Sequence, residues 1–198
     1  MKQANNKPFA EIIERSLHGW LAQSWQWDQF PPFGSLVSIP QEGYTYIGIV
    51  HQVQTGSMDP MRYPFPYKKT QEELMKEQPQ IFEFIKTTFN CLAIGSYYQG
   101  RISYTLPSAP PKIHSFVQPL DTDLMKQFFS NEKYLHILFA NGNTIENLDE
   151  LLLALLAQQK QEGALSQDKI TSFMQTYSLL TGNDYRRMKL FLQRATLS

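Results

Sequence analysis

The sequence contains almost no cysteine: Cys91 is the single one among 198 residues, so no disulfide can form within the chain. Its neighbours Phe89, Leu92 and Ile94 are apolar. Free cysteine in such surroundings usually packs as a small apolar side chain. We therefore expect Cys91 to be a buried strand residue and not a nucleophile.

Net charge and long apolar runs are also missing. The 18 basic and 18 acidic residues cancel, which argues against attraction of the whole surface to nucleic acid or to an anionic membrane, although a local patch is still possible. The longest aliphatic run, 151–157, is far shorter than the roughly 20 residues of a membrane helix. The first six residues show no apolar signal core. We expect a cytoplasmic protein with no membrane association.

Motifs of common catalytic sites are absent. The chain has no phosphate-binding Gly-x-x-x-x-Gly-Lys-Ser/Thr loop, no Gly-x-Gly-x-x-Gly and no Gly-x-Ser-x-Gly. Its four histidines show no metal-ligand spacing. We therefore predict no cofactor, no metal, no catalytic residue and no enzymatic activity. One alternative is that His51 and His114 lie on neighbouring strands and act as an acid–base pair, against the simpler reading of two hydrogen-bonded structural histidines.

What is present, between residues 33 and 119, is a series of short β-rich runs separated by glycine and proline. They predict a small, closed, antiparallel-rich β-barrel. The expected strands are 34–40, 44–53, 84–98, 101–106 and 113–117. The run 44–53 is apolar on both faces at its middle, where Gly48 marks a bend or a close backbone approach.

The flanking regions read as helical, which gives an α+β fold. In 1–32, apolar residues at three- and four-residue spacing predict an amphipathic helix over 8–22, and an aromatic linker follows with Trp25, Trp27 and Phe30. These aromatics either cover the open end of the barrel or form a partner-binding patch. In 120–198 we expect helices over 122–130, 132–140, 145–162, 166–180 and 183–195. The cations of the last helix indicate an acidic partner surface or simple solvation.

An insert at 54–80 interrupts the predicted barrel. Its loop, 54–69, has three prolines and an unusual content of methionine and aromatic residues. Thr70 and Glu73 then form a capping-box pattern for a short helix to about Gln78. We expect the loop either to bind a partner or to plug the barrel. The candidate partner-binding residues are Met58, Met61, Arg62, Tyr63, Phe65 and Tyr67.

Three segments resemble the HAS-barrel, the small β-barrel at the N-terminus of HerA-type DNA-translocating ATPases and of ATP synthase catalytic subunits. They are the opening run 34–39, the strand 46–50 and the closing run 110–117. The resemblance covers less than half of the chain and implies a barrel that makes subunit contacts. The ATPase domain of that family has no counterpart here, because 120–198 carries no phosphate loop, and no catalytic residue of the family is carried over.

Two functions follow as hypotheses. The first is a non-catalytic interaction or assembly module that binds a protein partner or itself. The second is a nucleic-acid-associated accessory factor of a HerA-type motor or nuclease, for which Arg62, Lys68 and Lys69 beside aromatic residues provide the signal. Three nearby basic residues are also a common solubilising feature of neutral proteins.

Overall fold

The computed structural model describes residues 7–59, 66–163 and 165–197. Its strands are β1 (Ala10–Arg15), β2 (Gly19–Ser24), β3 (Leu36–Gln41), β4 (Tyr44–Ser57), β5 (Ile85–Tyr98), β6 (Arg101–Ser103) and β7 (Phe116–Pro119). Its helices are α1 (Gln71–Glu77), the 3-10 helix η1 (Pro79–Phe84), α2 (Thr122–Phe128), α3 (Tyr134–Ala140), α4 (Leu148–Gln161), α5 (Gln167–Leu180) and α6 (Tyr185–Leu197). None of these helices is long and apolar enough to cross a membrane.

Six strands close into a barrel, and all their pairings are antiparallel. The order β2-β1-β7-β3-β4-β5 returns to its start because β5 also pairs with β2. The short strand β6 pairs with β5 outside this ring. The expected closed barrel and the α+β class are therefore confirmed.

The N-terminal helix expected over 8–22 is wrong: this region forms the β1–β2 hairpin, which belongs to the barrel. Ser16 donates its backbone N–H to the carbonyl of Gly19 at 2.8 Å and closes the turn. Ala10 and Ile12 on β1 are buried, whereas Ile13 is exposed, so the chain alternates with the period of a strand. The barrel consequently begins at Ala10 and not near residue 33.

Side chains of the strands themselves fill the barrel interior. Trp20 lies against Gly48, where a Cβ atom would collide with the indole ring, so the predicted close approach is confirmed and its partner is Trp20. Cys91 is buried, as expected, and burial raises the pKa of its thiol well above the ordinary value. The interior cluster comprises Ala10, Ile12, Trp20, Ala22, Val37, Ile39, Tyr46, Val50, Phe89, Cys91, Ala93 and Val117.

The last barrel strand is displaced from its expected position. We predicted a strand over 113–117, but β7 occupies Phe116–Pro119. His114 precedes it in a turn, with a φ of 65°, and its side chain contacts Glu11. The expected strand 101–106 likewise ends at Ser103.

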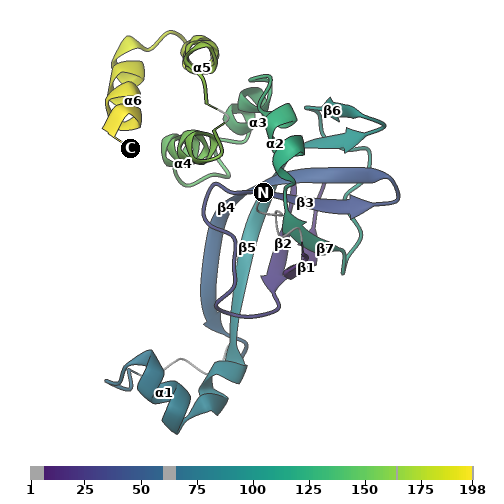
Figure 1. Cartoon of the computed structure of the whole chain (residues 1–198), viewed down its shortest axis with the longest axis vertical. Helices are drawn as coiled ribbons and strands as arrows, with labels where there is room; N and C mark the ends of the chain where they lie inside the picture. The colour runs from purple at the N-terminus through teal and green to yellow at the C-terminus, as the bar shows by residue number, and fades with distance from the viewer. Residues whose placement is uncertain (1–6, 60–65, 164, 198) are drawn as a thin grey trace.

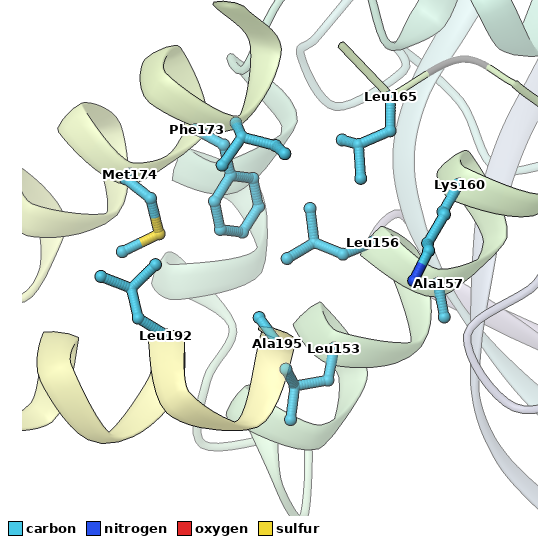
Figure 2. A pocket seen from close by; sticks show the side chains of 10 residues that line it. Leu153, Leu156, Ala157, Lys160, Leu165, Phe173, Met174, Leu192 and Ala195 are labelled. Atoms are coloured by element: carbon cyan, nitrogen blue, oxygen red, sulfur yellow. The ribbon is translucent and has the colours of Figure 1, made fainter. Parts of the chain in front are cut away.

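A layer of helices, α2 to α6, lies at one end of the molecule beside β3, β4 and β5 (Figure 1). The Asp121 side chain caps α2 and the Ser166 side chain caps α5. Asn183, which precedes the last helix, is in the left-handed region, and the Asp184 carboxylate accepts the backbone N–H of Arg187. Between α4, α5 and α6 lies a small apolar cavity (Figure 2).

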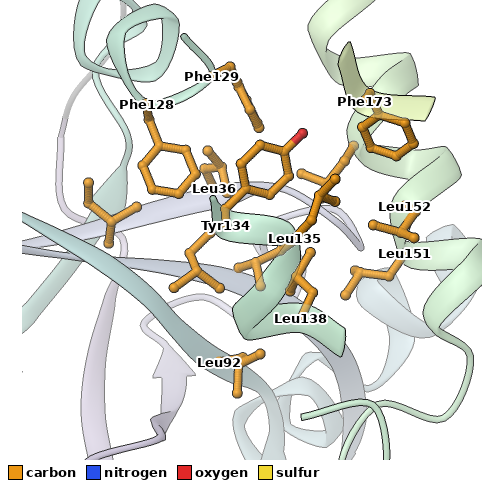
Figure 3. Packing of buried hydrophobic residues seen from close by; sticks show 14 of the residues in the cluster. Leu36, Leu92, Phe128, Phe129, Tyr134, Leu135, Leu138, Leu151, Leu152 and Phe173 are labelled. Atoms are coloured by element: carbon orange, nitrogen blue, oxygen red, sulfur yellow. The ribbon is translucent and has the colours of Figure 1, made fainter. Parts of the chain in front are cut away.

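A second core joins this helical layer to the outer face of the barrel (Figure 3). The outward-facing residues Leu36, Ile47, Ile49, Leu92 and Ile94 supply the barrel side. The strand over 44–53 is therefore buried on both faces at its middle, as predicted. The helical side comprises Leu120, Met125, Phe128, Phe129, Tyr134, Leu135, Leu138, Ile145, Leu151, Leu152, Leu155, Phe173, Tyr177 and Phe191.

Candidate partner-binding surface

Strands β4 and β5 continue as a two-stranded arm, residues 54–57 and 85–88, which extends past the last pair of β2 with β5 at Thr88. The pairing of β3 with β4 ends at Ile49, and that of β2 with β5 ends at Thr88. The pairing of β4 with β5 continues to Ser57 and Ile85. Figure 1 shows the arm extending to α1, at the opposite end of the molecule from the C-terminal helices. The loop expected over 54–69 is therefore wrong for residues 54–57, which belong to β4, and the remaining described residues of the predicted insert lie toward the tip of a projecting arm.

His51 lies where the arm leaves the barrel. The β4–β5 register shifts between Val50 and Gln52, so His51 is the extra residue of a β-bulge, a feature that bends a strand. Past this bulge Val53 packs against the barrel interior cluster, although the uninterrupted strand pattern placed it on the opposite face from Val50. The bulge sets the direction in which the arm projects.

A brace from the β2–β3 loop holds the base of the arm. The Thr55 and Thr87 hydroxyls are 2.7 Å apart across the two strands, and Thr87 also donates to the carbonyl of Trp27. The Trp27 ring stacks on Phe82 of η1 with ring centroids 5.3 Å apart. Because these contacts join the loop, both strands and η1, they restrict the hinge motion of the arm.

The tip, residues 66–84, is stabilised by local interactions. The predicted capping box is present: the Thr70 side chain accepts from the Glu73 backbone N–H, and the Glu73 carboxylate accepts from that of Thr70. Hydrogen bonds from the backbone N–H and the side chain of Thr70 to the Glu73 carboxylate lower the pKa of Glu73. Lys69 pairs with Glu77. Within residues 71–84, neither α1 nor η1 contains a buried residue, so the tip is not part of either core.

Large apolar side chains are exposed around this tip. Met58 is 46% exposed, Tyr67 39%, Met75 45% and Phe84 47%. Such side chains are typical of interface hot spots. We call these four residues the tip patch.

The structure describes two of the six predicted binding residues. Met58 and Tyr67 belong to the tip patch, whereas Met61, Arg62, Tyr63 and Phe65 lie outside the described residues. Met75 and Phe84 were not predicted. Met75 is on a seven-residue helix too short to show an apolar stripe, and Phe84 was expected to begin a strand.

The aromatic linker does not fill the barrel. Trp25 is exposed and lies edge-to-face against Phe116, Phe30 is also exposed, and Trp27 braces the arm. We expected these aromatics either to cover the open end of the barrel or to form a partner-binding patch. Their exposure gives no support to the first alternative for Trp25 and Phe30.

The structure gives no support to a histidine pair. His51 is on β4 and His114 precedes β7, strands that are not neighbours in the barrel. Burial lowers the pKa of His51, and Glu146 opposes this shift. In the part of the chain that the structure describes, no three His, Cys, Asp or Glu side chains gather closely enough to hold a metal ion.

Two basic residues of the last helix, Arg187 and Arg194, have acidic partners within the chain. The Arg187 guanidinium donates to the Asp149 carboxylate at 2.8 Å, and Arg194 pairs with Glu150. Both carboxylates are on α4. The acidic surface expected opposite these two cations is therefore provided by α4 of the same chain.

Comparison with protein-family models and with curated proteins finds no match for this sequence.

Proposed function

We propose that this protein is a non-catalytic interaction module that binds a protein partner, or a second copy of itself, through the tip of its arm. The observation that carries the proposal is that α1 and η1, within residues 71–84, bury no side chain while the tip patch is exposed. A seven-residue helix is marginal in water without tertiary packing. A partner that covers the tip patch would supply that packing.

The brace at the base of the arm supports the same proposal. Binding by a flexible segment loses affinity to the entropy of ordering it, and a restrained arm reduces that loss. Thr87, fully buried between Thr55 and Trp27, holds the two strands to the β2–β3 loop. The arm therefore presents its tip at a defined distance from the barrel.

The charge of the tip favours a protein over a nucleic acid. Residues 66–84 contain three basic side chains, Lys68, Lys69 and Lys76, and four acidic ones, Glu72, Glu73, Glu77 and Glu83, which gives a net charge of 3 − 4 = −1. Affinity for nucleic acid comes mainly from basic side chains that neutralise phosphates, and a surface with more acidic than basic residues disfavours such contacts. An accessory role on nucleic acid consequently ranks second.

The HAS-barrel resemblance is consistent with an assembly role but is a prediction. The resemblance implies a small closed β-barrel, and the barrel of this protein has six antiparallel strands. The β1–β2 hairpin completes this barrel and lies outside the segments that carry the resemblance.

The test replaces two residues of the tip patch in the full chain, Met75→Ser together with Phe84→Ser. Both side chains are exposed, so the melting temperature should stay close to that of the wild type. Self-association in sedimentation velocity, or recovery of a partner from the native cell extract, should fall at least tenfold.

The matched control is Leu179→Ser with Tyr185→Ser, two exposed residues of the helical layer. This variant should associate as the wild type does. A folded tip variant with undiminished association in both assays would overturn the proposal. Salt-sensitive binding of single-stranded DNA or RNA by the wild type, lost in Lys68→Ala with Lys69→Ala, would instead establish the accessory role.

A further inference from the structure

The cavity between the last three helices is formed by one face of each helix. Its volume is about 90 Å³. The lining residues of α4 are spaced at positions i, i+3, i+4 and i+7. Those of α5 and α6 are also three or four residues apart. Each helix therefore lines the cavity with one stripe of side chains. Its lining comprises Leu153, Leu156, Ala157, Lys160, Leu165, Ile170, Phe173, Met174, Leu192 and Ala195.

Two alanines make room for this cavity. Ala157 on α4 and Ala195 on α6 line it together with large apolar residues such as Leu156, Phe173 and Leu192. Larger side chains in place of these two alanines would fill the space, and the apolar faces of the three helices would then pack without a cavity. The lining is apolar, so water would find few hydrogen-bond partners in it, whereas a hydrocarbon group of matching size would be accommodated.

Lys160 is the one charged residue among those described that line the cavity. It lies two turns from Leu153 along the same face of α4, and Figure 2 shows its side chain beside those of Leu156 and Ala157. The apolar stem of a lysine packs on such a surface while its ammonium group stays in water. None of the described residues that line the cavity carries a carboxylate. The site thus combines an apolar interior with one cation at its edge.

We propose that this cavity binds an aliphatic carboxylate, with the hydrocarbon chain among the apolar stripes and the carboxylate on the Lys160 ammonium. The charge of Lys160 selects an anionic head group, and the volume selects a short chain. This site is separate from the tip patch, which lies at the other end of the molecule (Figure 1).

The experiment is a calorimetric titration of the full chain with hexanoate, repeated with acetate, hexanol and hexylammonium. Hexanoate should bind saturably with a stoichiometry of one, and at least fivefold more tightly than each of the other three. Acetate lacks the chain, hexanol lacks the charge, and hexylammonium reverses it. No saturable binding of hexanoate, or equal binding of hexylammonium, would overturn the proposal.

Two variants locate the site. Lys160→Met retains an apolar stem without the charge and should weaken hexanoate binding at least fivefold, whereas Lys189→Met, which alters an exposed lysine of α6 outside the cavity, should leave it unchanged. Ala195→Leu fills the cavity and should abolish binding while the far-ultraviolet circular dichroism spectrum stays that of the wild type. Wild-type affinity in the Lys160→Met protein would refute the assignment even if Ala195→Leu failed to fold.

Discussion

Position 48 requires glycine, because a neighbouring side chain occupies the space that any larger residue would need. A Cβ atom there would collide with the Trp20 ring, and Trp20 is itself buried in the barrel interior. We expect Gly48→Ala to lower the free energy of unfolding by about 1–3 kcal/mol, because overpacking forces a rigid ring to move. Gly56→Ala, on the same strand, meets no atom within 4 Å and should change stability little. Urea denaturation measures both, and equal effects would contradict this account of Gly48.

His51 should make stability depend on pH. Burial lowers its pKa in the folded protein below the ordinary value of 6.5. As the pH falls through about 6.5, the unfolded chain binds a proton at this position before the folded chain does, so stability is lost with falling pH. Between about pH 7.5 and 5.5 the melting temperature should therefore fall further in the wild type than in His51→Gln. Parallel curves for the two proteins would refute this role.

At the scale of the elements, Leu152 tests whether α4 is part of the core or an interface. Leu152 is fully buried in the cluster between barrel and helices. Leu152→Asp should destabilise the fold by about 3 kcal/mol or more, because an unpaired charge is placed in an apolar core. Leu179→Asp, at a position 72% exposed, is the matched control and should have little effect. A folded Leu152→Asp protein with an unchanged melting temperature would place this leucine outside the core.

Sequence patterns predicted the helices correctly where capping residues and apolar spacing within the segment determine them. They failed where pairing with a distant strand determines the secondary structure. The helices of 120–198 have leucine stripes and caps such as Asp121 and Ser166, and they formed as expected. Residues 8–22 show helical spacing as well, yet they form strands, because pairing of β2 with β5 closes the barrel. Gly19 was the available signal for a turn and a close approach, since a Cβ there would meet the carbonyl of Cys91.

The candidate site was predicted in part for a similar reason. Prolines and aromatics marked 54–69 as an unusual loop, and the capping box of Thr70 marked the helix that follows. That strands β4 and β5 would run beyond the barrel could not be predicted, because it depends on where their neighbours β3 and β2 stop pairing. The sequence therefore identified the insert but not its projection as an arm.

At the scale of the whole molecule, the barrel with its helical layer differs from the tip of the arm in how its side chains are buried. The barrel and the helical layer share one buried cluster and the barrel interior holds a second, whereas residues 71–84 at the tip add no buried side chain to either. The barrel interior is filled by its own strands, so a loop that plugs the barrel is not needed to complete the core. The tip should therefore be removable without unfolding the rest.

A deletion tests this separation. Ser57 and Ile85 are paired across the arm, so an Asn-Gly turn can replace residues 58–84 and close a two-residue hairpin. We expect the shortened protein to lose only about 1 kcal/mol of stability, chiefly from the stacking of Trp27 on Phe82, and to keep a single cooperative melting transition. It should also lose the association assigned to the tip patch. A loss of several kcal/mol would show that the insert completes the barrel, and full stability with undiminished association would remove the arm from the function of this protein.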